Sequence, residues 1–235
     1  AELQRIASHL VWLATHALEI GAVSVMMYCF RERELLLNIN EMLAGFRMFP
    51  SYIRVGGLRE DLPLGFHEAV TKFLDAFPGK LNEYEDLLTK NQVWLKRTRD
   101  VGIITKEECS QYGITGPMAR SCGLAYDIRK DHPYLVYDRF DFDVPIGSVG
   151  DNFDRFAVRV EEMHQSMRIV EQALAISSMF LRDSQAIVSV KAATAKTTGS
   201  VGVRPKRIPR ARPVTMSAAP APMSIGMRLR HIRIT

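Results

Sequence analysis

The sequence has few cysteines, and they form neither a metal-binding motif nor a disulfide framework. Its three cysteines, Cys29, Cys109 and Cys122, are odd in number and widely spaced, and no Cys-x-x-Cys pair occurs. Paired motifs of that kind hold zinc or iron–sulfur clusters, and even numbers of cysteines are typical of disulfide-bonded secreted domains. The cysteines therefore support neither a disulfide framework nor a zinc or iron–sulfur site, and a reducing, cytoplasmic setting fits best.

Long uncharged apolar runs and internal repeats are also missing. No stretch of 18 or more residues reads as a membrane span, since even residues 11–30 contain His16 and Glu19. No signal peptide is recognisable, and the chain opens without a methionine inside a helical pattern, as a fragment would. The hydrophobic content of 47% is enough for a sizeable core.

Acidic residues are absent from the last part of the chain. Ten of the 31 Lys and Arg residues follow Asp183, so the first 183 residues hold 21 basic and 26 acidic side chains. A mildly acidic part therefore precedes a strongly basic one, rich in Ala, Thr, Ser, Val and Pro. Such a composition buries too little apolar surface to offset the entropy of the chain. We expect a folded part over residues 1–178 and a disordered or out-of-frame tail over residues 179–235.

The first long apolar stretch, residues 2–30, contains no proline and has a helical pattern. At about 100° per residue, its polar side chains fall in one narrow seam, and apolar residues cover the rest. A helix that is apolar on most faces is buried, and buried polar groups need partners. The seam is therefore expected to face a cavity, a cofactor or another subunit. Its members are Arg5, His9, Trp12, His16 and Glu19.

The seam has two further interpretations. It is either a set of satisfied polar groups in the core, or part of a metal site. The i, i+3 spacing of His16 and Glu19 is one used by di-metal helical bundles, and Glu161 with His164 is the second match in the chain.

The rest of the folded part predicts further helices with short β segments between them. Residues 35–45, 67–77, 80–99 and 151–175 have helical apolar spacing, with a break at Pro78-Gly79. Thr105 and Glu108 form a capping box. Residues 52–57 and 140–144 read as strands. The fold class expected is mainly α: a helical bundle with short β segments and a basic tail.

A series of motifs extends through the folded part, in one order and spacing. They are residues 2–10 (ELQRIASHL), 15–22 (THALEIGA), 30–34 (FRERE), 52–57 (YIRVGG), 116–123 (GPMARSCG), 126–130 (YDIRK), 142–147 (FDVPIG), 150–155 (GDNFDR) and 161–168 (EEMHQSMR). Together they resemble the 49-kDa subunit family of the proton-pumping NADH–quinone oxidoreductase, respiratory complex I. That family is similar in fold to the large subunit of nickel–iron hydrogenases, whose metal-binding Cys-x-x-Cys pairs are absent here.

The resemblance implies a function in electron transfer to a quinone. A partner subunit would hold the terminal 4Fe-4S cluster, and this chain would bind no cofactor and line the chamber where quinone is reduced, with coupling to proton translocation. The implied partners are the other complex I subunits, above all the terminal-cluster subunit and the 30-kDa-type subunit. The implied location is the cytoplasmic side of the cell membrane, as a peripheral protein. The family's quinone-contacting His and Tyr lie upstream of this chain, and its C-terminal part is missing.

Two departures from the family pattern affect the expected site. The carboxylate that partners the family's quinone-site His is usually Asp, and it falls on Glu19, which has a longer side chain. Many members carry a His near the terminal cluster where this chain has Phe49. A phenyl ring neither donates a hydrogen bond nor takes up a proton, so Phe49 predicts a low-potential cluster with little pH dependence. Such a cluster suits menaquinone rather than ubiquinone.

The candidate site residues have a functional and a structural interpretation. Glu19 is either part of a proton relay to quinone or a buried, hydrogen-bonded carboxylate. Arg54, Arg120 and Arg129 either tune the field at the cluster or quinone, or form structural ion pairs. His16 is expected near the quinone or the cluster, yet His9 and His16 are also read as satisfied core groups. The remaining pair, Asp141 and Asp143, is read as the solvated side of a strand.

Two other classes of function stay open from the sequence. One is a di-metal helical-bundle protein, for which stoichiometric metal binding by purified protein is the test. The other is a basic-tailed nucleic-acid-binding protein, which requires salt-sensitive binding that is lost on deletion of residues 184–235. The preferred interpretation assigns no nucleic-acid partner.

Overall fold

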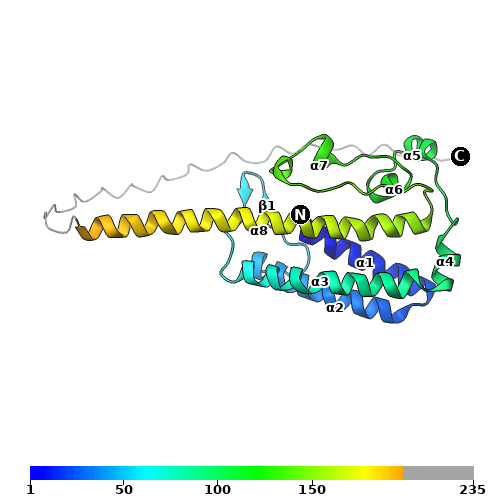
Figure 1. Ribbon diagram of the computed structural model, residues 1–235, viewed down its shortest axis with the longest axis horizontal. Helices are drawn as coiled ribbons and strands as arrows, with labels where there is room; N and C mark the ends of the chain where they lie inside the picture. Colours follow the sequence, from blue (N-terminus) through cyan, green and yellow to red (C-terminus); the bar gives the residue numbers. More distant parts are fainter. Residues whose placement is uncertain (198–235) are drawn as a thin grey trace, which may run out of the picture. The chain divides into compact units, whose positions relative to one another are not determined.

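A computed structural model describes the backbone of residues 1–197 and the side chains of residues 1–178 (Figure 1). This part is mainly helical with one small sheet, as predicted. Within residues 1–197, no helix is both long and apolar enough to cross a membrane. The elements in chain order are α1 (Glu2–Ile20), α2 (Val23–Ala44), β1 (Ile53–Arg54), β2 (Gly57–Leu58), α3 (Phe66–Thr89), α4 (Gln92–Thr98), α5 (Lys106–Gln111), α6 (Gly116–Ser121), α7 (Ile128–Asp131), η1 (Tyr137–Arg139) and α8 (Asn152–Thr197).

The first apolar stretch forms two helices instead of one, because the chain turns at Gly21. Gly21 has a φ of 100°, in the left-handed region that favours glycine. Its N–H donates to the Leu18 carbonyl at 2.9 Å, and the N–H of Ala22 donates to the Ala17 carbonyl at 2.8 Å. This bonding is that of a Schellman motif, which ends a helix by satisfying its last carbonyls. The expected single helix over residues 2–30 is therefore wrong, and α2 folds back to pack on α1.

The third helix, α3, continues through the expected break at Pro78. Proline removes one backbone hydrogen bond inside a helix, but the apolar face of α3 is buried on both sides of it. Phe77 is 1% exposed and Leu81 is fully buried. Packing therefore outweighs the local cost. The chain breaks later, at Asn91, whose side chain caps α4 by accepting hydrogen bonds from the N–H groups of Val93 and Trp94.

One apolar core joins α1, α2, α3, α4 and the first turns of α8. α1, α2 and α3 run alongside one another (Figure 1), and α8 adds Phe156, Val160, Met163 and Met167 to the same buried cluster. The side chains that α1 contributes are fully buried or nearly so: Ile6, Ala7, Leu10, Leu13, Ala14 and Ala17. The predicted helical bundle is confirmed.

The expected strand over residues 140–144 is an extended segment with no strand beside it. Its alternation is real, since Phe142 is fully buried between Asp141 and Asp143, which both face solvent. The backbone N–H groups, however, find side chains on α8. Asp141 donates to Gln172 Oε1 at 2.8 Å, and Asp143 donates to Gln165 Oε1 at 2.9 Å. Two glutamine side chains of α8 thus take the place of the backbone hydrogen bonds that a neighbouring strand would supply. Within residues 1–197 the sheet is the hairpin of β1 and β2 alone.

The two caps read from the sequence are confirmed. Thr105 and Glu108 form the reciprocal capping box at the start of α5. Asp151 caps α8, since its Oδ1 accepts a hydrogen bond of 2.7 Å from the N–H of Asp154. The expected end of this last helix near Ala175 is too early, because α8 extends to Thr197. The expected tail boundary falls inside α8, and residues 198–235 lie outside the described part of the chain.

Candidate functional site: a buried ionic network

The polar seam of α1 meets polar residues of α8 in the interior. His9 Nε2 lies 2.7 Å from Glu162 Oε2, although their positions are 153 residues apart in the sequence. Both are nearly inaccessible, with 7% and 1% of their surface exposed. The seam therefore faces the chain's own last helix at this point, not a cavity, a cofactor or another subunit. His9 therefore has its hydrogen-bond partner within the core of the chain itself.

A second group, Arg120, binds the same carboxylate from α6. Its Nε donates to Glu162 Oε1 at 2.7 Å, and its Nη2 lies 2.5 Å from the same oxygen. Its Nη1 donates to the carbonyl of Tyr126 at 3.0 Å. Arg120 is only 4% exposed. A fork of this kind fixes both the position and the orientation of a carboxylate, so Glu162 is held from two sides.

Glu2, at the start of α1, forms a second buried anchor. Its carboxylate accepts hydrogen bonds from Arg129 Nη1 at 3.1 Å, from the Tyr137 hydroxyl at 2.5 Å and from the Ser166 hydroxyl at 2.7 Å. The half-buried Arg5 adds a contact of 3.2 Å. These donors come from four different parts of the chain, so one carboxylate joins α1, α7, η1 and α8.

Asp127 links the two anchors. It accepts a two-pronged contact from Arg129, with Nε to Oδ1 at 3.0 Å and Nη2 to Oδ2 at 2.7 Å. On its other side, Arg120 Nη1 lies 3.8 Å from Asp127 Oδ2. The result is one connected set, which we call the ionic network. Its members are Glu2, Arg5, His9, Arg120, Asp127, Arg129, Tyr137, Glu162 and Ser166. The interpretation of Arg120 and Arg129 as members of structural ion pairs is confirmed.

The carboxyl groups of the network remain charged in spite of burial. Burial raises the pKa of Glu162, but the hydrogen bond from His9 and the charge of Arg120 outweigh it and hold the pKa below its usual value. The same balance lowers the pKa of Glu2 and of Asp127. Burial and the bond to Glu2 raise the pKa of the Tyr137 phenol, so it donates in its neutral form. The stabilisation is present above the ordinary carboxyl values and is lost as the pH falls through the lowered pKa values.

His16 lies two turns further along α1, in an aromatic pocket. Its ring stacks on Trp12 and meets Trp94 edge-on, each with a centroid distance of 5.1 Å. His16 Nε2 and Trp94 Nε1 are both buried and have no hydrogen-bond partner among the described side chains. Burial, followed by the charge of Arg159, lowers the pKa of His16. The neutral form of His16 is thus favoured, and no described side chain satisfies its Nε2.

This lowered pKa predicts a pH-dependent stability. A histidine whose pKa is lower in the folded state binds protons better when the chain unfolds. Its stabilising contribution is therefore complete above the ordinary value, about 6.5, and falls as the pH drops through that value towards the folded-state pKa. We expect His16→Gln to flatten the dependence of the unfolding free energy on pH between about pH 5 and pH 7. Urea unfolding of the purified chain at several pH values measures it, and an unchanged slope would contradict the assignment.

Other predicted site residues lie away from the network. Glu19 is exposed at the end of α1. Phe49 is 88% exposed in the loop after α2, with a φ of 53°, and Arg54 is exposed on β1, where its Nε donates to the Ser51 carbonyl at 3.3 Å. The structure brings none of these three into the network. The alternative interpretation of Glu19 as a buried carboxylate is wrong, and the functional roles of the three residues stay predictions. Within residues 1–197, no three metal-ligating side chains gather at one place. Among the side chains of residues 1–178, the structure therefore does not bring the His16–Glu19 and Glu161–His164 motifs together as a metal site.

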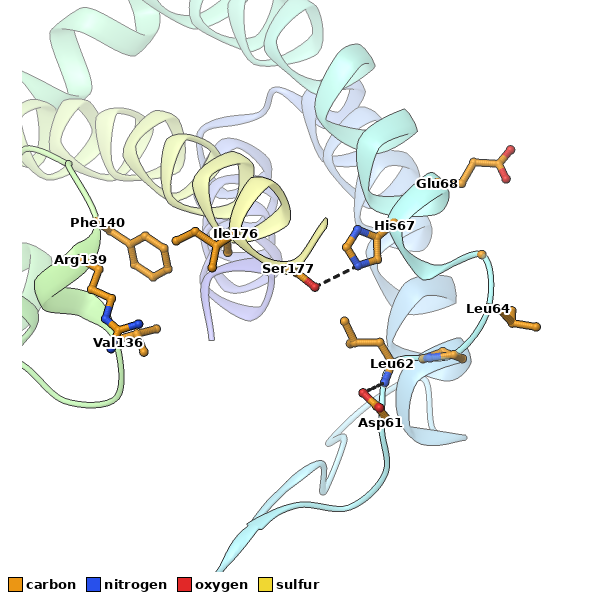
Figure 2. Close-up of a pocket in the computed structure, with 13 residues that line it drawn as sticks. Asp61, Leu62, Leu64, His67, Glu68, Val136, Arg139, Phe140, Ile176 and Ser177 are labelled. Atoms are coloured by element: carbon orange, nitrogen blue, oxygen red, sulfur yellow. Dashed lines mark hydrogen bonds between the residues drawn. The ribbon is translucent and has the colours of Figure 1, made fainter. Parts of the chain in front are cut away.

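A groove of about 800 Å³ opens between α3, α8 and η1. His67 of α3 and Ser177 of α8 face each other across it, with 3.2 Å between His67 Nε2 and Ser177 Oγ (Figure 2). A neighbouring groove of about 710 Å³, lined mainly by apolar side chains, shares Leu62, Val136 and Phe140 with it. Ala1, Leu3 and other residues of the first turn line this second groove.

The sequence did not single out Glu2, Asp127, Glu162 or Tyr137. One signal was present on α8, where Glu162 and Ser166 are four residues apart, beside apolar positions such as Met163 and Met167. Polar residues on a helix face that is otherwise buried indicate a buried polar cluster. The partners of Glu2 and the pairing of Glu162 with His9 were out of reach, because those residues are more than 100 positions apart.

Comparison with known proteins gives the family of the chain. Residues 19–202 match the family described as "Respiratory-chain NADH dehydrogenase, 49 Kd subunit". The chain belongs to this family. The match covers α2 and α3 and includes the segment that supplies Arg120, Asp127 and Glu162.

Curated relatives agree with this assignment, and all three described here are NADH-quinone oxidoreductase subunits. The chain is 55% identical over 173 residues to one from Solibacter usitatus, which covers 74% of this chain and 42% of the relative. It is 52% identical over 174 residues to one from Geotalea uraniireducens, covering 74% and 45%. A longer relative from Aquifex aeolicus is 52% identical over 174 residues, covering 74% and 30%. The chain spans less than half the length of these relatives.

Proposed function

We propose that the chain is part of the quinone chamber of an NADH–quinone oxidoreductase. In this function, electrons from NADH reach a quinone through the terminal 4Fe-4S cluster of a partner subunit, and the reaction is coupled to proton translocation. The observation that carries the proposal is the identity of 55% over 173 residues to the Solibacter usitatus oxidoreductase relative. The arrangement of α1 supports it, since the helix places Glu19 at an exposed end and an unpartnered histidine one turn before it.

In this proposal, the chain contributes to the protonation of the reduced quinone. A quinone that takes up two electrons also takes up two protons to become a quinol, so carboxyl and imidazole groups beside it set the rate of protonation. Glu19 orients and charges a histidine supplied by the rest of the chamber, much as an outer carboxylate fixes a ligating histidine. His16 is held neutral close behind Glu19.

Exposed apolar side chains support assembly with partner subunits. A large share of them lies in the segment between α2 and α3, where Phe49 and Leu64 are 88% and fully exposed. Exposed apolar side chains that gather into a patch are typical of interfaces between proteins. The exposed members of this segment are Phe46, Met48, Phe49, Ile53, Val55, Leu58, Leu62 and Leu64. The proposed partners are the terminal-cluster subunit and the 30-kDa-type subunit, in a complex bound peripherally on the cytoplasmic side.

The test of the proposed function is Glu19→Gln in the intact oxidoreductase. We expect the complex to assemble but to reduce quinone at least about 10-fold more slowly, because the neutral amide no longer supports protonation of its partner. NADH oxidation with a water-soluble quinone measures it. The matched control is Glu171→Gln, an exposed carboxylate on α8, which should keep wild-type turnover. Normal quinone reduction by an assembled Glu19→Gln complex would refute the role.

A second variant tests the proposal for Phe49. In the intact complex, Phe49→His should raise the potential of the terminal cluster and make it fall with pH, because an imidazole stabilises the reduced state by donating a hydrogen bond and by taking up a proton. The slope should approach the limit of about 59 mV per pH unit for one proton per electron. Redox titration at several pH values measures it. A wild-type cluster that already shows this slope would mean that another group supplies the proton.

A further inference from the structure

His9 and Glu162 form a buried pair that the proposed function leaves unused. The imidazole and the carboxylate are 2.7 Å apart, and Arg120 holds the other carboxylate oxygen. His9 retains 7% exposure, whereas Glu162 has 1%. The pair is therefore fixed in place, and its small remaining exposure is at His9.

The charges of the ionic network balance without His9. Its carboxylates are Glu2, Asp127 and Glu162, and its guanidinium groups are Arg5, Arg120 and Arg129. Imidazole is the one side-chain type here that changes charge around neutral pH. The imidazole of His9 is therefore the member of the network whose chemistry suits it to pass a proton on, next to a carboxylate.

A row of groups leads from this pair along α1 towards Glu19. His16 lies seven residues beyond His9, about 10 Å along the helix, and Glu19 follows one turn later. Arg159 occupies the interval, with its guanidinium 4.4 Å from the centre of the Trp12 ring, and its charge acts on both Glu162 and His16. The buried Nε2 of His16 has no partner among the described side chains. Buried polar atoms of this kind are normally satisfied by water.

We propose that His9, held by Glu162, is the entry of a proton path that runs through His16 to Glu19. The inference rests on the proposed function and adds a supply route to it. When Glu19 or its partner gives a proton to the reduced quinone, a proton leaves His9 and passes by way of water and His16 to the vacated group. His9 returns to its neutral form, still bonded to Glu162, and takes its next proton from solvent.

The groups that face His9 and His16 set the conditions of this path. Glu162 of α8 binds His9, Arg120 of α6 binds the same carboxylate, and the charge of Arg159 of α8 acts on His16. Glu2, with Arg5 and the neutral Ser166, forms the second anchor of the network. Asp127 and Arg129 complete the charges behind Arg120. The charge of Arg159 disfavours a lasting positive charge at His16, so His16 passes protons on. Glu162, bound to His9, fixes the point where the path begins.

The experiment is His9→Gln in the intact oxidoreductase. The glutamine amide still donates a hydrogen bond to Glu162 but takes up no proton, so the packing of α1 on α8 is kept. We expect quinone reduction to fall about tenfold or more towards alkaline pH, where protons are scarce, and to approach wild type at acidic pH. Electron transfer from NADH to ferricyanide, which takes up electrons without protons, should be unchanged at every pH.

The matched control is His164→Gln, which removes a histidine on α8 outside the proposed path. It should leave the pH profile of quinone reduction as in wild type. A wild-type profile in His9→Gln would overturn the path. Should that variant fail to assemble, His16→Gln applies the same test, with the same alkaline loss expected and a wild-type profile overturning the path. Failure of the proposed function is distinct, because the wild-type complex would then reduce no quinone at all.

Discussion

Replacing Arg129 by methionine is expected to lower the free energy of unfolding by about 3–5 kcal/mol. The guanidinium is 1% exposed and joins Glu2 to Asp127. Its loss leaves two buried carboxylates without their main cation, and breaking a buried ion pair costs this much because the remaining charge stays desolvated. Methionine fills a similar volume, so the effect reports the charge and not a cavity.

Urea denaturation of the purified chain, followed by circular dichroism, measures the change. Arg168→Met is the matched control, since Arg168 pairs with Asp141 and Asp143 at the surface, where those partners are 77% and 79% exposed. Exposed pairs contribute about 1 kcal/mol or less. Similar losses in the two variants would show that the buried network gives no more stability than surface pairs do.

Replacing Gly150 by alanine is expected to cost about 3 kcal/mol or more, the sum of backbone strain and overpacking. Gly150 has a φ of +78°, and an added Cβ would lie 2.4 Å from the Ile104 carbonyl oxygen. That backbone cannot move freely, because the N–H of Ile104 donates to the Gly150 carbonyl at 3.1 Å. The loop before α8 should therefore shift, together with the cap that Asp151 provides.

The matched control is Gly45→Ala at the end of α2. Gly45 has a similar φ of +74°, but nothing lies within 4 Å of an added Cβ. It should cost only the left-handed strain, about 1–2 kcal/mol. Thermal unfolding of both variants gives the comparison. If Gly150→Ala cost no more than Gly45→Ala, the close approach to Ile104 would be refuted.

The helical class and the buried face of α1 were predictable from the sequence because both depend on local periodicity. Ile6, Leu10 and Leu13 repeat at helical spacing and are fully buried. The helix boundaries were not predictable to the same degree. Gly21 ends α1 although the apolar pattern continues past it, and Pro78 does not end α3, because tertiary burial of the face around it overrides the local preference.

Local sequence patterns could not predict which residues of the site pair with one another. The seam of α1 predicted that His9 needs a polar partner, and the structure supplies Glu162 from the last helix. For residues 140–144 the alternation predicted a buried face correctly, but it could not show that glutamines of α8 would replace a neighbouring strand. A polar helix face predicts that buried partners are needed, but only the fold shows which residues they are.

The bonds of Glu2 also set an order of events during synthesis. The first residues leave the ribosome early, but Arg129, Tyr137 and Ser166, the main donors to Glu2, follow 127, 135 and 164 positions later. Contacts between such distant residues form late, since the intervening loop must close first. Until those three donors emerge, Glu2 has only Arg5 of the same helix as a partner, and the start of α1 lacks most of the contacts that bury it. A nascent chain released before Ser166 would be expected to aggregate or to be held by chaperones.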